Sequence, residues 1–241
     1  MPIRLRIREA PLRTATVEVA GRPVNVAVRR NPRARRLYLR IDPVRADVVL
    51  VLPRGVGLQE GLRFAHDRRS WLAGRLAAMP AHMPFADGVA IPFLGEPLTI
   101  RHDQAGRGPA MRIGSELRVG GRPEHLARRV RDWLKAQARL VLSARSRVYA
   151  ERVGRAIARV RIGDPKSRWG SCSARGGLAY SWRLVLAPPD VMDYVVAHEV
   201  AHLVEHNHGR RFWALVEKLT SGSYAARSWL RRNGNTLLRY G

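Results

Sequence analysis

The sequence predicts an α+β fold with two regions, and two observations support this class. Residues 1–57 contain short alternating or β-branched runs of the kind that form strands. Apolar residues recur at helical spacing over residues 58–78 and, in a longer stretch, over residues 123–153. We therefore expect a β-rich N-terminal region with one helix at residues 1–121, followed at residues 122–241 by a domain in which helices pack against a small sheet.

The first region begins with strands that are separated by turns. The strongest strand signals lie at residues 24–28, 37–41 and 48–52. Two dipeptides that end in proline, Asn31-Pro32 and Asp42-Pro43, indicate turns between these strands. The helix expected at residues 58–78 ends at the proline-containing segment 79–84, and residues 88–120 return to strand and turn character with several glycines.

The second region alternates between helices and short strands. In chain order we expect a helix at 123–153, a strand at 159–162, a loop at 163–173, a strand at 178–186, and helices at 191–204, 210–219 and 222–232. Pro189 marks the start of the helix at 191–204, since proline is well tolerated in a first turn. That helix is apolar apart from a few residues, which indicates a position in the core.

Composition limits the classes of protein to consider. The single cysteine, Cys172, excludes an internal disulfide and a zinc site built from several cysteines. Residues 1–8 alternate basic and apolar side chains and lack the apolar run of a signal peptide. No segment approaches the roughly 18 uncharged apolar residues of a membrane span. We expect a soluble cytoplasmic protein with no membrane partner, and the sequence gives no indication of its oligomeric state.

The net charge of +25 suggests a polyanionic partner, of which nucleic acid is the first candidate. The basic residues are almost all arginines and are spread along the whole chain, however, a pattern that a GC-rich genome also produces. No zinc finger, helix-turn-helix or RNA-binding signature is present. We therefore expect at most non-specific binding of nucleic acid through the basic surface.

The most informative segment has the pattern H-E-x-x-H, with His198, Glu199 and His202 on an expected helix. Residues four apart on a helix differ by only about 40° around its axis, so both imidazoles can bind one metal ion. Zinc suits neutral imidazole, and Glu199 would accept a proton from a water activated by the metal. The alternative is a hydrogen-bonded histidine pair in the core. We favour the metal because four of the eight histidines lie within residues 198–208.

The third ligand has three candidates, His208, Glu205 and His206. Glu205 and His206 would lie on or near the metal face if the helix continued. His208 requires the helix to end first, and the sequence Asn207-His208-Gly209 offers such an end. We favour His208. Three histidines would leave the fourth position open, which is typical of catalytic rather than structural zinc sites.

Two motifs together resemble the YgjP-like branch of the SprT-type zinc metallopeptidases. One is the run from His198 to Trp213, and the other is the block at residues 166–173 followed by Tyr180-Ser-Trp-Arg-Leu184. The resemblance implies a zincin-like α+β fold, the metal ligands His198, His202 and His208, and Glu199 as the catalytic residue. Ser181 departs from the family pattern, in which asparagine is expected. The resemblance implies no particular substrate.

Other residues have weaker functional interpretations. Arg168 is a candidate to bind a substrate carboxylate or an oxyanion, and Cys172 is a possible nucleophile with no sign of activation. Tyr180 and Tyr224 are candidate hydrogen-bond donors to the transition state. The strand at 178–186 is a candidate to pair with an extended substrate.

These observations predict a zinc-dependent metallopeptidase that hydrolyses peptide bonds, with Zn²⁺ as cofactor and a peptide or protein as substrate. The alternative is a nucleic-acid-associated protease, or a DNA-binding protein, that the basic surface recruits to DNA. A purely structural zinc site is a third reading, and the open fourth position argues against it.

Overall fold

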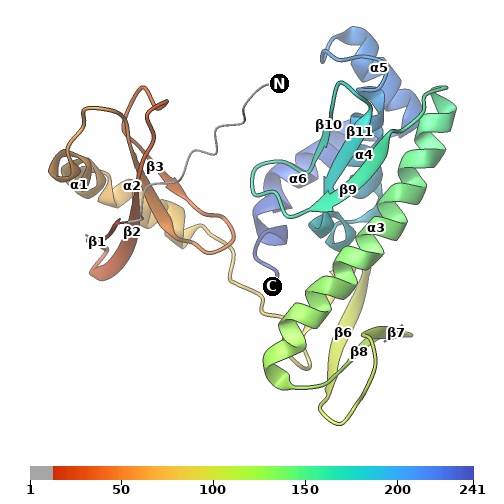
Figure 1. The fold of residues 1–241 in the computed structure, drawn as a ribbon, viewed down its shortest axis with the longest axis horizontal. Coiled ribbons are helices and arrows are strands. Elements are labelled where there is room, and N and C mark those ends of the chain that lie inside the picture. The colour runs from red at the N-terminus through yellow and green to blue at the C-terminus, as the bar shows by residue number, and fades with distance from the viewer. Residues whose placement is uncertain (1–12) are drawn as a thin grey trace, which may run out of the picture. The chain divides into compact units, whose positions relative to one another are not determined.

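The computed structural model describes residues 13–241, and the chain divides into two compact units, Met1–Pro80 and Ala81–Gly241. The basic and apolar alternation at the N-terminus lies outside the described residues. Figure 1 shows the elements of both units, which are described separately below. Among the described helices, none combines the length and the apolar character that crossing a membrane requires.

The first unit is a four-stranded sheet with two helices. The strand order is β1-β2-β4-β3, with β1 at Arg13–Val19, β2 at Arg22–Arg30, β3 at Tyr38–Ile41 and β4 at Val48–Leu52. Ala20 and Gly21 join β1 to β2 with φ values of 50° and 72°, as in the two-residue turns that suit the twist of a hairpin. All residues of β4 are buried, because it pairs on both sides and lies under a helix.

The helix expected at residues 58–78 is divided into α1 at Leu58–Asp67 and α2 at Arg69–Ala77. The chain changes direction at Arg68, where φ is −96° and ψ is 12°. Both helices contact β1, whereas one straight helix of that length would extend for about 30 Å. The bend therefore keeps Leu72 of α2 in the core of the unit.

The second unit contains two sheets and one long helix, α3 at Leu126–Arg152, which follows a short 3₁₀ turn at Pro123–His125. One sheet has the order β5-β6-β8-β7, with β5 at Ala90–Phe93, β6 at Glu96–Asp103, β7 at Met111–Ile113 and β8 at Glu116–Gly120. The other has the order β10-β11-β9, with β9 at Arg159–Gly163, β10 at Gly170–Cys172 and β11 at Gly177–Ser181. Figure 1 shows α3 running from the first of these sheets to the second.

The structural division after Pro80 differs from the boundary expected between residues 121 and 122. Buried side chains of the β5–β8 sheet, including Ile100 and Leu117, share one core with Val130 and Leu134 of α3. Residues 81–121 therefore pack with the C-terminal part of the chain. The strand pattern alone could not show this, because it depends on which apolar face α3 covers.

The motif helix, α4 at Pro189–Ala201, lies in the middle of the second unit. It contacts α3, strand β10, and the two C-terminal helices, α5 at Arg210–Leu219 and α6 at Ser223–Leu237. Most of its side chains are buried, as the apolar sequence predicts. The predicted α+β class is confirmed, with a β-rich N-terminal part followed by a domain in which the motif helix packs beside a small sheet.

The prediction of a strand at residues 178–186 is wrong for the second half of that segment. β11 ends at Ser181, and residues Trp182–Leu186 form a buried 3₁₀ helix, η2. The hydroxyl of Ser181 accepts a hydrogen bond from the backbone N–H of Arg183, which caps this turn. Apolar runs of this length do not distinguish a buried strand from a buried helical turn.

The side chain of Arg183 links η2 to the C-terminal end of α6 by hydrogen bonds. Its side chain is 1% exposed, and its guanidinium lies 4.4 Å from the ring centre of Trp182. Nε donates to Asp164 at 3.0 Å, and Nη1 donates to the carbonyl oxygens of Leu237 and Tyr240. The charge is tolerated in the core because these acceptors satisfy it. Burial nevertheless lowers the pKa of Arg183 from its ordinary value.

Candidate active site

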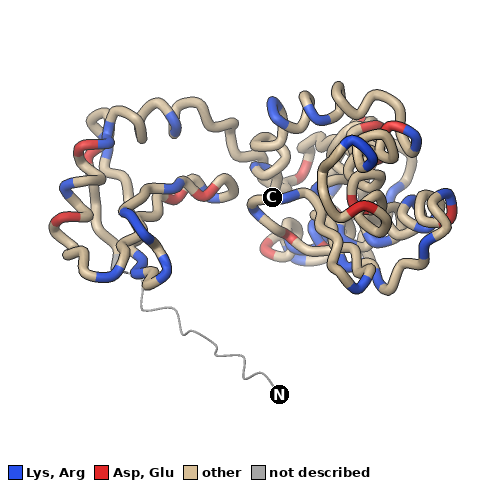
Figure 2. Tube along the Cα trace, turned by 90° about the horizontal axis from the view of Figure 1, so that it is seen from above, with Lys and Arg blue, Asp and Glu red and all other residues tan. Residues whose placement is uncertain are grey.

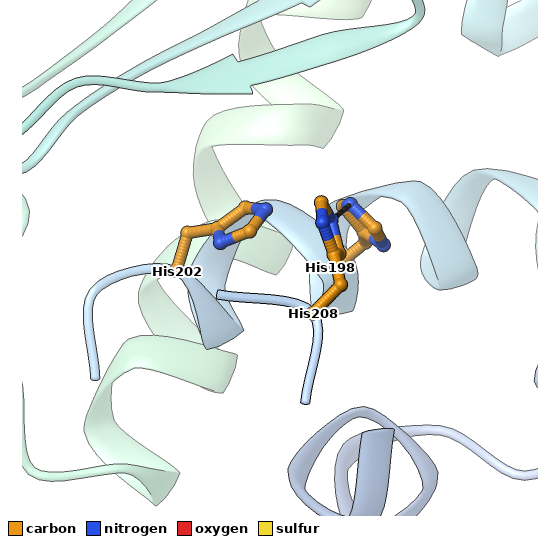
Figure 3. Close-up of side chains that lie close together, drawn as sticks. All are labelled: His198, His202 and His208. Carbon is orange, nitrogen blue, oxygen red and sulfur yellow. Dashed lines mark hydrogen bonds between the residues drawn. The ribbon is translucent and has the colours of Figure 1, made fainter. Parts of the chain in front are cut away.

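Three histidine side chains converge at the end of α4 and the loop that follows it (Figure 3). His198 lies in the last turn of α4, His202 caps that helix, and His208 comes from the segment before α5. One ligand atom from each ring lies within 4.8 Å of the other two, and Nε2 of His208 is 3.1 Å from Nε2 of His198. Nitrogens bound to one tetrahedral zinc would be about 3.3 Å apart, given Zn–N bonds of about 2.0 Å. The three rings therefore suit a shared cation.

The helix that carries the motif ends earlier than the sequence suggests. α4 ends at Ala201, with His202 as its last helical position (φ −66°, ψ −13°), instead of continuing to Val204. The N–H groups of Leu203 and Val204 bond to carbonyl groups three residues back, which tightens the chain. Residues 207–209, where the sequence offers an end to this helix, lie beyond it, and Gly209 is extended with φ −79° and ψ −175°. This early turn brings His208 back to His198.

The other two candidate third ligands do not join the group. Among residues 13–241, the convergent set contains His198, His202 and His208, without Glu205 or His206. Glu205 contributes its backbone carbonyl, which lies 3.1 Å from Nδ1 of His202. A carbonyl only accepts hydrogen bonds, so Nδ1 of His202 holds the proton and Nε2 keeps its lone pair. This contact orients the ring as ligand histidines are commonly oriented.

The pKa values of His198 and His202 favour the neutral form that metal binding requires. Burial, together with positive charge on His202, His208 and Arg227, lowers the pKa of His198 to about 4. Burial also lowers the pKa of His202. The facing Nε2 atoms of His198 and His208 need a proton or a cation between them, because two lone pairs repel. The chemistry of this donor set fits a divalent metal ion.

Aromatic side chains of α5 support the three rings. The ring centre of Phe212 lies 4.9 Å from that of His198, 4.5 Å from that of His202 and 4.7 Å from that of His208. Trp213 stacks on His208 with 5.8 Å between ring centres. The buried Nδ1 of His198 has no hydrogen-bond partner in residues 13–241, so packing holds this ring in place. Phe212, Val216 and Leu219 of the same helix are buried.

Glu199 lies beside the histidines and is almost completely buried, with 6% exposure. Burial raises the pKa of its carboxyl to about 7, and the positive charge of Arg168 acts in the opposite direction. A carboxyl group with a pKa near 7 can both accept and donate a proton close to neutral pH. Its position and its acidity suit a general base.

Gly170 of β10 leaves room for the Glu199 carboxylate. A Cβ atom at position 170 would lie 2.6 Å from both Cγ and Oε1 of Glu199. Carbon atoms normally approach no closer than about 3.5 Å, so no larger residue fits without moving the carboxylate. The absence of a side chain at position 170 thus leaves the space that the Glu199 carboxylate occupies.

Gly170→Ala is expected to lower hydrolysis of a peptide substrate by about tenfold or more, because a displacement of about 1 Å at a reacting group is costly. The matched control is Gly163→Ala in the same sheet, where a Cβ would meet only Pro165, at 3.8 Å. Turnover and bound metal are measured for both variants. Full activity in Gly170→Ala would show that Glu199 does not need this position.

A cavity of about 430 Å³ opens beside the three histidines and contains His198 and Glu199 in its wall. The other lining residues are Arg168, Trp169, Gly170, Tyr194, Val195, Arg227, Leu230 and Arg231. The wall therefore consists of the 168–170 segment, α4 and α6. Its size is typical of sites for small ligands or for parts of larger ones.

The weaker candidates from the sequence have different positions. Arg168 lines the cavity, as its proposed role requires. Tyr180 is buried and its hydroxyl accepts a hydrogen bond from Ser146 at 3.0 Å, whereas Tyr224 is 85% exposed, so neither lines the cavity. Burial raises the pKa of Cys172, which keeps its thiol protonated. β11 pairs with β9 and β10 on its two sides and has no free edge for a substrate strand.

Sequence reasoning missed Tyr194, Gly170, Arg227 and Arg231. Tyr194 precedes His198 by one helical turn, and this spacing was a signal that was available. Its ring centre lies 6.0 Å from that of His198. The contact between Gly170 and Glu199 joins segments that are far apart in the sequence, and no local pattern indicates it. Arg227 and Arg231 of α6 are also far from the motif in the sequence, and no local pattern indicates that they reach the site.

Comparison with known proteins gave two matches. The family model described as YgjP-like, metallopeptidase domain, matches residues 35–233. Among solved structures, the chain is similar to the crystal structure of the metallopeptidase zymogen of Pyrococcus abyssi abylysin. The sequence identity is 24%, the TM-score is 0.35, and the match covers 41% of this chain and 97% of that chain. No curated protein matched.

Proposed function

Because the chain belongs to the YgjP-like metallopeptidase family, we propose that it hydrolyses peptide bonds with a zinc ion held by His198, His202 and His208. The observation that carries this proposal is the convergence of three imidazoles from two separate segments, with one ligand atom from each ring within 4.8 Å of the other two. A site with three protein ligands keeps a position open for chemistry. The zincin-like fold expected from the sequence is consistent with the α+β architecture of residues 81–241.

Zinc, when bound, supplies Lewis acidity that polarises a carbonyl group and lowers the pKa of water to about 7. Glu199 accepts the proton of the attacking water and delivers it to the nitrogen of the leaving amine. Gly170 leaves the room that this position of the carboxylate needs. The ring of His202 is oriented by its hydrogen bond to the Glu205 carbonyl, and Phe212 packs against all three rings.

Zinc binding is tested on the purified chain without reference to any substrate. We expect about one zinc ion per chain by elemental analysis, and a rise in the midpoint of thermal unfolding when zinc is added after treatment with a chelator. Binding to the folded state alone stabilises it by about 4 kcal/mol at a thousandfold excess over Kd. Mg²⁺, which prefers oxygen ligands, is the control and should have little effect. Equal stabilisation by both ions would contradict the proposal.

The basic surface supports no second function. Among residues 13–241, Lys and Arg lie at scattered positions along the trace of both units in the view of Figure 2. Charge of this kind favours non-specific contact with polyanions but does not define a nucleic-acid site. The metallopeptidase activity therefore remains the function that the observations support best.

A further inference from the structure

Three arginine side chains line the cavity beside the metal centre. Arg168 comes from the loop before β10, and Arg227 and Arg231 come from α6. The cavity has one acidic residue in its wall, Glu199, which the proposed mechanism already uses. The rest of the wall beyond the arginines and the catalytic groups is apolar or aromatic. The space next to the reacting groups is therefore strongly positive.

The arrangement of these charges is unfavourable without a ligand. Arg227 and Arg231 are four residues apart on α6, where like charges destabilise a helix. Within the described part of the chain, none of the three arginines forms an ion pair with a carboxylate. The guanidinium of Arg227 lies 5.3 Å from the ring centre of Trp213, which holds it near the metal centre. An anion bound between the arginines would offset their repulsion.

We propose that this cavity binds a carboxylate of the peptide substrate, so that the enzyme prefers an acidic side chain or a free C-terminus close to the scissile bond. The inference rests on the proposed function, because it takes the peptide to be the occupant. Guanidinium groups bind carboxylates through paired, charge-assisted hydrogen bonds. A cavity of about 430 Å³ holds a few side chains, whereas a nucleic-acid duplex needs an extended surface. The size and the shared wall with Glu199 therefore favour a peptide.

Binding is measured with the zinc-loaded full chain carrying Glu199→Gln, so that no cleavage interferes. The probes are fluorescein-labelled decapeptides of one neutral sequence that carry Glu, Gln or Lys at a central position. Each is made with a free carboxyl or an amidated C-terminus. Fluorescence anisotropy gives the affinities, and the Glu peptide with an amidated end is compared with the Gln peptide with a free end. These two probes distinguish a side-chain carboxylate from a terminal one.

We expect at least one carboxylate-bearing probe to bind about tenfold more tightly than the amidated Gln peptide. Arg227→Gln and Arg231→Gln should each reduce this preference by about threefold to tenfold. Arg232→Gln is the matched control, because Arg232 is exposed on the same helix but lies outside the cavity and bonds to Ser228. It makes the same change in net charge and should leave the preference intact.

Three results would overturn the inference. One is equal binding of acidic, amide and lysine probes, and another is an acidic preference that survives both arginine variants. The third is a short single-stranded oligonucleotide that binds more tightly than any peptide and loses affinity in the same variants, since the cavity would then be a phosphate site. Failure of the proposed function is distinguishable: the chain with Glu199 intact would leave the bound peptides uncut, while the dependence on Arg227 and Arg231 persisted.

Discussion

Glu199→Gln is expected to lower the rate of peptide hydrolysis by about 10²- to 10⁴-fold, the range that general acid–base catalysis contributes. The amide has nearly the shape of the carboxylate but cannot accept the proton of water. The buried position beside Gly170 should therefore still hold the side chain. Rates are measured under single-turnover conditions, with bound zinc determined in the same samples.

The matched control for this variant is Glu151→Gln, which makes the same chemical change at an exposed position of α3. It should retain full activity. Bound zinc should stay at the level of the unaltered chain in both variants, because Glu199 is not one of the three proposed ligands. Normal turnover in Glu199→Gln would refute the assigned base, whereas loss of zinc would indicate a role in holding the metal.

His208→Ala is expected to weaken zinc binding by more than about 10²-fold. Removing a group that only orients a ligand costs about 10- to 100-fold, and removing a ligand should cost more. His208 lies 3.1 Å from His198 through their Nε2 atoms, so its loss opens one side of the site. The affinity is measured by competition with a chromophoric chelator, and activity is followed at the same zinc concentrations.

His206→Ala serves as the comparison, since His206 is exposed, lies two residues away and is outside the convergent group. It should bind zinc as tightly as the unaltered chain. The sequence leaves His208, His206 and Glu205 as alternatives, and this pair of variants separates the first two. A larger effect from His206→Ala than from His208→Ala would mean that the loop adopts another arrangement when it binds metal.

Sequence patterns located most elements but not all of their ends. The helix at Arg210–Leu219 has the limits that the sequence predicts, because its apolar side chains form one clear stripe. The strand at 178–186 was too long, since the hydroxyl of Ser181 caps a 3₁₀ turn that no periodicity indicates. The break at Arg68 and the position of residues 81–121 likewise depend on tertiary packing, which overrides local preference.

In the candidate site, too, local sequence patterns predict some residues, whereas others are brought in by tertiary packing. His198, Glu199 and His202 follow from helical spacing, and the structure places His208 beside them through an earlier helix end than the sequence indicates. Gly170 and the arginines of α6 reach the site from segments that lie far away in the sequence. A single sequence contains no local signal for such contacts. The sequence therefore predicts the candidate metal ligands, the neighbouring Glu199, and Arg168, but not the rest of the cavity wall.

The third histidine lies outside α4, in the segment that leads into α5, and this affects when the chain can acquire a metal ion. A nascent chain that has formed only α4 presents two imidazoles and a weak chelate. His208 is in place only after α5 has docked and Phe212 has packed beneath the rings. Tight metal uptake therefore follows folding, since a complete site rarely exists in an unfolded chain. Peptidase activity is therefore expected only in chains that have already folded.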